Sequence, residues 1–109
     1  MIYHVSQTYK SGALESIAVQ LGEAEAIEAF CEKWEDADAA LAVYHVNYIH
    51  CHDTIEQARE FAEEFGGNVF AIDADAMADD YIEIERDTLE YDHPIIRDEI
   101  PAEFITIVA

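Results

Sequence analysis

The sequence predicts an α+β domain in which helices pack on a mostly antiparallel sheet. Apolar residues with the spacing of amphipathic helices concentrate before residue 66, whereas most runs typical of strands come after it. Helices and strands segregated in this way favour the α+β class over a parallel α/β arrangement. At 109 residues the chain has the length of one domain, which we expect to span residues 1–109.

The N-terminal part of the chain begins with a strand and continues as helices. Residues 2–5 are β-prone and precede a polar loop. From Ser11 the apolar residues recur at i, i+3, i+4 and i+7, which predicts a helix over 11–21 with Gly22 at its C-terminal cap. The same spacing runs over 26–41, and acidic residues near Glu35 leave open whether this stretch is one bent helix or two short ones.

The middle of the chain predicts a strand followed by a helix. Residues 44–51 are rich in β-branched and aromatic side chains, which favour a strand. Asp53 and Glu56 have the spacing of a capping box, and the apolar stripe that follows continues to the Gly66-Gly67 pair. We therefore expect a helix to begin after Asp53 and to end at these glycines.

The C-terminal part of the chain predicts mostly strands. Residues 68–72 are an apolar run typical of a buried strand, and 75–79 are predicted as a short helical turn. The alternation of apolar and polar residues over 81–85 indicates a half-exposed strand, whereas 89–98 lack any period. A final strand is predicted over 104–108.

The chain is strongly acidic. Twenty-five acidic side chains face five basic ones, which gives a formal net charge of -20. Such a polyanion is repelled by phosphate backbones and by anionic lipid, so binding to duplex nucleic acid or to a membrane is not expected. Three interpretations of the acidity stay open: a solvated surface, a face that docks a basic protein or imitates nucleic acid, and cation binding.

The cysteines and the absence of long apolar runs indicate a cytoplasmic protein. Cys31 and Cys51 lie in apolar contexts with no disulfide or C-x-x-C pattern, and Cys51 is expected to be a core thiol. No leader-like segment is present, and no run approaches the roughly twenty apolar residues of a membrane span. The oligomeric state stays open, with pairing of the 81–85 strand across a two-fold axis as a route to a homodimer.

Histidines lie inside strand-like runs at both predicted early strands. In the central strand, alternation puts Tyr48, His50 and His52 on one face. An H-x-H pair can ligate zinc, but a metal site needs three or four ligands, so no metal residues are assigned. His4 lies in the first strand, where a hydrogen-bonded core role is the commoner one. As the alternative, we expect His4 and His50 to line one cleft, to which His93 would add a third imidazole.

Several short motifs occur in an order that resembles a known fold. They are YHVS at the N-terminus, the leucine-bearing helix over 11–21, YIHCHDTIEQAREFAEEFGG leading into NVFAIDADAM, and IPAEFITIV at the C-terminus. Together they resemble the small ADP-ribosyltransferase-like fold, particularly the RNA 2'-phosphotransferases. A small uncharacterised bacterial family with a MIYH start and an I-H-C strand is similar too. The resemblance spans most of the chain.

This resemblance implies a set of site residues. It makes His4 the first-strand residue that contacts the ribose on the nicotinamide side of NAD, and His50 the imidazole of the second strand. Glu103 stands where some transferases of this fold carry the acid of their closing strand. These three residues are the implied catalytic set. The implied cofactor-binding residues are Tyr3, Tyr48, Arg86 and Arg97, with the two arginines meeting phosphates.

The chain also departs from the RNA 2'-phosphotransferases, because it lacks the arginines that those enzymes use around their substrate. A net charge of -20 opposes both RNA and the pyrophosphate of NAD. Two hypotheses follow. The first is a member of this fold that binds a nucleotide or NAD-like ligand near His4 and His50, with its enzymatic activity either altered or lost. The alternative is a non-enzymatic acidic interaction or inhibitor protein that docks a basic partner.

Overall fold

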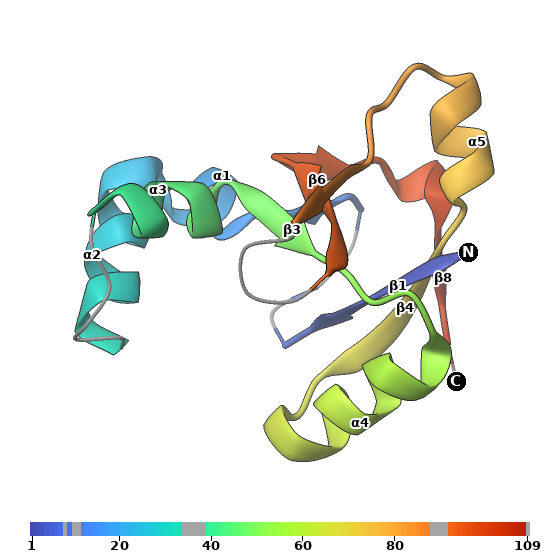
Figure 1. The fold of residues 1–109 in the computed structure, drawn as a ribbon, viewed down its shortest axis with the longest axis horizontal. Helices are drawn as coiled ribbons and strands as arrows, with labels where there is room; N and C mark the ends of the chain where they lie inside the picture. The colour runs from blue at the N-terminus through green and yellow to red at the C-terminus, as the bar shows by residue number, and fades with distance from the viewer. Residues whose placement is uncertain (8, 10–11, 34–38, 88–91, 109) are drawn as a thin grey trace.

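The computed structural model describes residues 1–7, 9, 12–33, 39–87 and 92–108 (Figure 1). Within these ranges, helices pack on sheets whose paired strands are all antiparallel, which confirms the predicted α+β class. The helices are α1 (Ile17–Leu21), α2 (Glu23–Lys33), α3 (Ala39–Val46), α4 (Ile55–Phe65), α5 (Ala74–Asp79) and the short 3-10 helix η1 (Ala102–Phe104). The strands are β1 (Ile2–Ser6), β2 (Leu14–Glu15), β3 (Tyr48–His50), β4 (Asn68–Ile72), β5 (Glu85–Asp87), β6 (His93–Arg97), β7 (Glu99–Ile100) and β8 (Ile105–Ile107).

The strands form two three-stranded sheets and a short pair. The first sheet has the order β1-β4-β8, the second has the order β3-β6-β5, and β2 pairs with β7. Tyr3 and His52 form an antiparallel bridge between the two larger sheets, with N–O distances of 2.9 and 2.6 Å. His52 lies two residues after the end of β3, so the bridge places β1 next to β3. Across the two larger sheets the strands therefore lie side by side in the order β5-β6-β3-β1-β4-β8.

The main hydrophobic core is shared by both larger sheets. Side chains alternate along β1, so Ile2 and His4 lie on the same face as their register partners Ile72 and Phe70. This face meets buried side chains of β3 and β6, with α5, β7 and η1 closing the core. The buried residues of this core are Ile2, Leu14, Ile49, Cys51, Phe70, Ile72, Met77, Ile96, Ile100 and Phe104.

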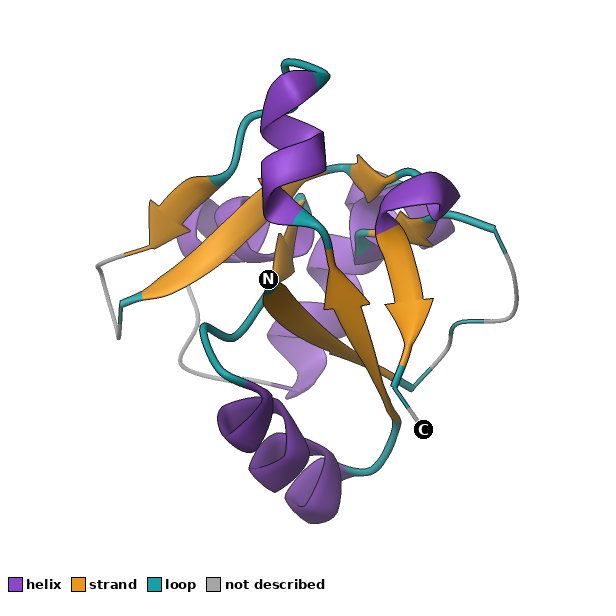
Figure 2. Cartoon of the chain, turned by 90° about the vertical axis from the view of Figure 1, so that its right-hand side faces the viewer, coloured by secondary structure: helices purple, strands orange, loops and turns teal. Residues whose placement is uncertain are grey.

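The helices cover different parts of these sheets. α4 packs on the opposite face of β1 and β4, where Ala58 meets Val5 and Val69. α1, α2 and α3 gather around a smaller cluster that includes Ala26 and Val46. Figures 1 and 2 show α4 and α5 at opposite ends of the molecule, with the strands between them. In the part of the chain that the structure describes, no helix has the length and apolar character needed to cross a membrane.

α4 begins one residue later than the sequence predicts. Its N-cap is Thr54, whose hydroxyl accepts a hydrogen bond from the backbone N–H of Gln57 at 3.2 Å. The side-chain oxygen of Gln57 accepts in return from the N–H of Thr54 at 3.3 Å, which completes a capping box. Asp53 is therefore not the cap, and Glu56 is not its partner, because the Asp53 carboxylate binds Arg86 instead.

The predicted helix over 11–21 is shorter than expected. Leu14 is buried and pairs with Ile100 in the β2–β7 ladder, so this stretch is a strand. The helix begins only at Ile17, after Ser16 accepts a hydrogen bond from the N–H of Val19 at 3.3 Å. Leu14 is apolar and buried in the core, so it fits the helical spacing of the residues after it although it lies in a strand. Gly22 follows α1 as predicted.

The described parts of the second helical stretch are helical on both sides of residue 35. They are α2 (Glu23–Lys33) and α3 (Ala39–Val46). The point near Glu35 where a bend or a break was expected lies outside the described residues.

The strand predicted over 44–51 is also shorter than expected. Residues 44–46 belong to α3, and the strand itself is Tyr48–His50. Val46 is buried in the cluster of α1, α2 and α3, which holds it in the helix despite its β propensity. The side chain of Asn47 then donates hydrogen bonds to the carbonyl of Val43 at 2.7 Å and to Glu23 at 3.0 Å. Packing among the three helices therefore overrides local propensity here.

Three C-terminal elements agree with the sequence. The strand predicted over 68–72 is β4, with the same bounds. The helical turn expected over 75–79 is α5, which begins one residue earlier with Asp73 as its N-cap. The closing strand is β8, and Phe104 lies before it in η1.

The strand predicted over 81–85 does not form at 81–84. Tyr81 has a left-handed φ of 60° and its N–H donates to the carbonyl of Ala78 at 3.1 Å, so the chain turns at this point. A strand begins only at Glu85, where β5 pairs with β6. The homodimer expected from pairing of the 81–85 strand therefore loses its structural basis.

β6 lies within the stretch where the sequence showed no period. His93, Pro94, Ile95 and Ile96 are all buried, because β6 is the middle strand of its sheet. A strand that is buried on both faces carries no alternation of apolar and polar residues. This explains why pattern analysis missed it.

The turn from α4 into β4 contains two glycines, and the requirement for glycine is stricter at Gly67 than at Gly66. Gly66 and Gly67 both have positive φ, at 81° and 106°. A Cβ on Gly67 would lie 2.8 Å from the carbonyl oxygen of Ser6, whereas a Cβ on Gly66 would meet nothing within 4 Å.

We expect Gly67→Ala to lower the free energy of unfolding by about 1–2 kcal/mol more than Gly66→Ala, because the backbone strain is shared and only Gly67 adds a collision with β1. Urea unfolding followed by circular dichroism measures both variants. Equal losses in the two variants would contradict this account of the turn.

Candidate functional site

All five histidines of the chain lie around β3. The β3–β6 pairing and the Tyr3–His52 bridge bring together the segments that carry them. We call these residues the histidine cluster. They are His4 on β1, His45 near the end of α3, His50 on β3, His52 directly after β3, and His93 at the start of β6.

His50 lies at the centre of the histidine cluster. Its Nε2 is 3.0 Å from the carbonyl oxygen of His45, and its Nδ1 is 2.9 Å from Nε2 of His93. The His50 and His45 rings also stack, with centroids 4.3 Å apart. A carbonyl only accepts, so Nε2 of His50 carries a proton. In a neutral His50 ring, Nδ1 then accepts the hydrogen bond that Nε2–H of His93 donates.

His4 is attached to β3 through the backbone of His50. Its Nδ1 donates a hydrogen bond to the carbonyl oxygen of His50 at 2.7 Å. Burial, together with the nearby His50 and His52 rings, lowers the pKa of His4 to about 4, while the hydrogen bond to the carbonyl acts in the opposite direction. His4 is therefore a neutral donor at pH 7. The structure brings His4 and His50 together. The contact joins the ring of His4 to the backbone carbonyl of His50, and not to the His50 ring.

His52 connects the histidine cluster to α4. Its backbone forms the bridge with Tyr3, and its ring packs on Phe61 with centroids 5.3 Å apart. Burial lowers the pKa of His52, the nearby His93 lowers it further, and Asp53 opposes both. His52 thus lies at the edge of the cluster that faces α4.

Three of the histidines, His45, His52 and His93, were not assigned to the site from the sequence. His93 was named only as a third imidazole for the cleft, and the structure does place its ring beside His50, with centroids 5.2 Å apart. His45 was missed because 44–51 was expected to be a strand. In α3 it instead stacks between His50 and Phe30, whose ring centroid is 4.7 Å away. The sequence signal that could have indicated this contact is the spacing of five residues between His45 and His50, with the end of α3 between them.

The other implied catalytic residue and the two tyrosines lie in different surroundings. Glu103 is exposed on η1, which packs against α5. Among the described residues, no hydrogen bond or ion pair joins it to the histidine cluster. Tyr3 lies on the α4 side of β1, opposite the face that carries His4. Tyr48 packs on Tyr44, with ring centroids 5.2 Å apart.

Arg86, which the resemblance assigns to a phosphate, binds two carboxylates. Its Nη1 and Nη2 donate to the two oxygens of Asp53 at 3.1 and 2.6 Å, and its Nε donates to Asp92. These hydrogen bonds hold the pKa of Asp53 below its ordinary value and raise the pKa of Arg86. These contacts of Arg86 with Asp53 and Asp92 connect the segment before α4 with the strands β5 and β6. A phosphate could bind Arg86 only by displacing these carboxylates.

The Cζ of Arg97 lies 5.7 Å from the ring centroid of Tyr48, and its Nε lies 3.9 Å from Oδ2 of Asp98. In the described parts of the chain, no group of three or more His, Cys, Asp or Glu side chains is arranged to hold a metal ion.

Cys51 is a core thiol, as the alternation along the central strand predicted. It is 1% exposed and belongs to the main core. Burial raises the pKa of the Cys51 thiol above its ordinary value, which makes a thiolate nucleophile unfavourable.

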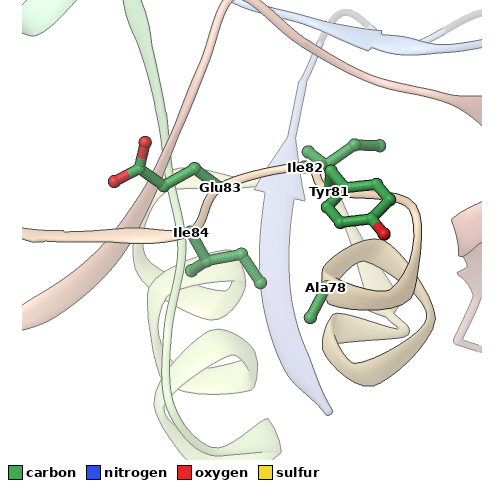
Figure 3. A pocket seen from close by; sticks show the side chains of 5 residues that line it. All are labelled: Ala78, Tyr81, Ile82, Glu83 and Ile84. Atoms are coloured by element: carbon green, nitrogen blue, oxygen red, sulfur yellow. The ribbon is translucent and has the colours of Figure 1, made fainter.

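Two surface hollows are formed by described residues. One lies beside Tyr81 after α5 and is mostly apolar, with Ile82 and Ile84 among its walls (Figure 3). The other, which we call the α4 groove, lies between α4 and the start of β6. It is lined by His52, Gln57, Glu60, Phe61, Glu64 and the Asp92-His93 pair.

Comparison with known proteins gives no relative for this chain. No family model, no curated protein and no solved structure matches it.

The low pKa of His4 gives a test of its role. An unfolded His4 would bind a proton below about pH 6.5, whereas the folded one binds only near pH 4. Its contribution to stability is present above pH 6.5 and is lost as the pH falls toward 4, by roughly 3 kcal/mol in total.

We expect His4→Asn to remove this pH dependence, because the amide N–H can replace Nδ1–H as a donor to His50 and does not titrate. Urea unfolding of both proteins at several pH values between 7 and 4 measures the effect. A stability difference between them that stays constant over this range would rule out the proposed role of His4.

Proposed function

We propose that this chain is a small ligand-binding domain of the ADP-ribosyltransferase-like class, which binds a nucleotide or NAD-like ligand beside the histidine cluster. The observation that carries the proposal is the contact between histidines of three neighbouring strands. His4 on β1 meets the backbone of His50 on β3, and the His50 ring meets His93 on β6. The resemblance implies a site between the first-strand and second-strand histidines, and this adjacency supports it.

The chemistry of the cluster favours some parts of such a ligand over others. Neutral imidazoles and backbone carbonyls bind hydroxyl and amide groups through hydrogen bonds, which suits a ribose or a nicotinamide carboxamide. Phosphates are less favoured, because Arg86 is held by two carboxylates and the net charge is -20. We therefore propose recognition through the sugar and base, with the phosphates directed toward solvent. The proposal includes binding and leaves transfer chemistry aside.

Ligand binding has a direct test in thermal stability. We expect NAD or ADP-ribose at millimolar concentration to raise the Tm of the protein. At about ten times Kd, mass action stabilises the folded state by roughly 1.4 kcal/mol, which corresponds to about 6 °C for a domain of this size. His50→Phe should abolish the shift, because it keeps a ring for stacking on His45 and removes both ring nitrogens.

Tyr81→Phe is the control, since it also removes a polar atom from an aromatic side chain and lies outside the histidine cluster, in the hollow after α5, and it should keep the shift. Imidazole NMR signals give a second readout. Absence of a Tm shift in the unmodified protein, together with unchanged His4 and His50 signals at millimolar ligand, would exclude the nucleotide proposal.

A second candidate function is favoured by the charge distribution. Twenty-five acidic residues face five basic ones, and the described Arg86 and Arg97 both have carboxylates as their neighbours. The outward field of the molecule is therefore strongly negative. This supports a non-enzymatic interaction or inhibitor protein that docks a basic partner.

A further inference from the structure

The α4 groove combines one exposed aromatic ring with carboxylates. Phe61 lines the groove and is 36% exposed. Its ring centroid lies 5.3 Å from that of His52, which also lines the groove, and 4.7 Å from that of Phe65, which does not. An exposed phenylalanine ring is costly in water unless something covers it. Phe61 therefore gives the groove an apolar surface that a ligand can cover.

Carboxylates line the groove beside the Phe61 ring. Glu60 and Glu64 lie one helical turn apart on α4 and line the groove together with Phe61. Among the described residues, no basic side chain forms an ion pair with either glutamate. Asp92, which also lines the groove, shares the guanidinium of Arg86. The charge of the groove is thus set mainly by two glutamates that lack a cation.

The other faces of α4 have different surroundings. Ala58 is fully buried against the first sheet. Glu56 and Glu63 are exposed, and they do not line the groove. At 100° per residue Glu56 lies about 40° and 80° from Glu60 and Glu64 around the helix, and Glu63 lies about 60° and 100° from them. The helix therefore carries two pairs of glutamates that differ in position and not in charge.

Charge complementarity selects the occupant of the α4 groove. A net charge of -20 repels nucleic acid, phosphorylated ligands and a second copy of this chain. It attracts cationic segments, and an arginine side chain fits both features of the groove. The guanidinium plane can stack on an aromatic face while its N–H groups donate to carboxylates at the edge.

We propose that the α4 groove binds an arginine side chain of a basic, extended segment in a partner protein. In this complex the guanidinium covers Phe61 and donates hydrogen bonds to Glu60 and Glu64. The inference rests on the second candidate function, for which it names the surface and the chemistry of the partner. The groove shares His52 and His93 with the histidine cluster, but the inference does not require nucleotide binding by that cluster.

The test uses the full chain and a defined probe, acetyl-Gly-Arg-Gly-Arg-Gly-amide, in titration calorimetry at low salt. We expect binding with NMR shifts at Phe61 and His52. Glu60→Gln combined with Glu64→Gln should weaken binding by at least about tenfold, whereas Glu56→Gln combined with Glu63→Gln should weaken it by less than about threefold. A citrulline peptide, which lacks the charge, should not bind.

Each contrary outcome has a definite meaning. Equal weakening by the Glu60/Glu64 and Glu56/Glu63 double variants would show that the α4 groove is not the binding site. The peptide would then bind through the overall negative charge of the protein. Absence of binding by the arginine peptide at any salt concentration would overturn both the groove and the general docking of basic segments. Sedimentation that shows self-association through α4, abolished by the Glu60 and Glu64 variants, would assign the groove to a second copy and overturn the proposed partner.

Discussion

The fold depends on the junction at which β1 meets the end of β3. Two backbone hydrogen bonds between Tyr3 and His52 join the sheets there, and the ring of His4 adds a third connection through the carbonyl of His50. Without this junction the molecule would consist of two small sheets, each too small to bury a core alone. With it, side chains of both sheets share one core, and α4 is held against the back of β1.

The junction also explains why the histidines gather where they do. At the junction His93 is buried, His4, His50 and His52 are half-buried, and His45 is exposed. Where water does not reach, hydrogen-bonding groups have to be satisfied by one another. Neutral imidazoles meet this need at low cost, because each offers one donor and one acceptor without a charge to desolvate. Among the described residues, no buried side-chain nitrogen or oxygen lacks a partner. The same hydrogen bonds that stabilise the junction thus arrange polar atoms from three strands in one place.

Sequence patterns predicted the elements whose signals are local. The helix before the Gly66-Gly67 pair and the strand over 68–72 were found with nearly correct bounds, because their caps and apolar stripes lie within the element itself. Residues 44–46 and β6 were misassigned, since packing against distant segments decides their structure. A strand that is central in its sheet and a helix end that is covered by two other helices have no local signal.

The candidate site was predictable to a similar extent. Alternation and the position of the first strand pointed to His4 and His50, and the late His93 was a further candidate, all of which the structure places near one another. The role of Arg86 was not predictable. Its partners Asp53 and Asp92 come from segments that only the folded chain brings together, and an acidic chain offers many carboxylates that could compete for it.

Confinement of every imidazole to one junction has an electrostatic consequence for the whole molecule. Burial lowers the pKa of His52 and, together with the neighbouring rings, lowers that of His4 to about 4. In mild acid these two rings therefore stay neutral while the seam between the sheets is closed. States in which the seam opens and the rings reach water bind protons more readily, so acid favours them. A mildly acidic compartment would therefore loosen the contact between the two sheets.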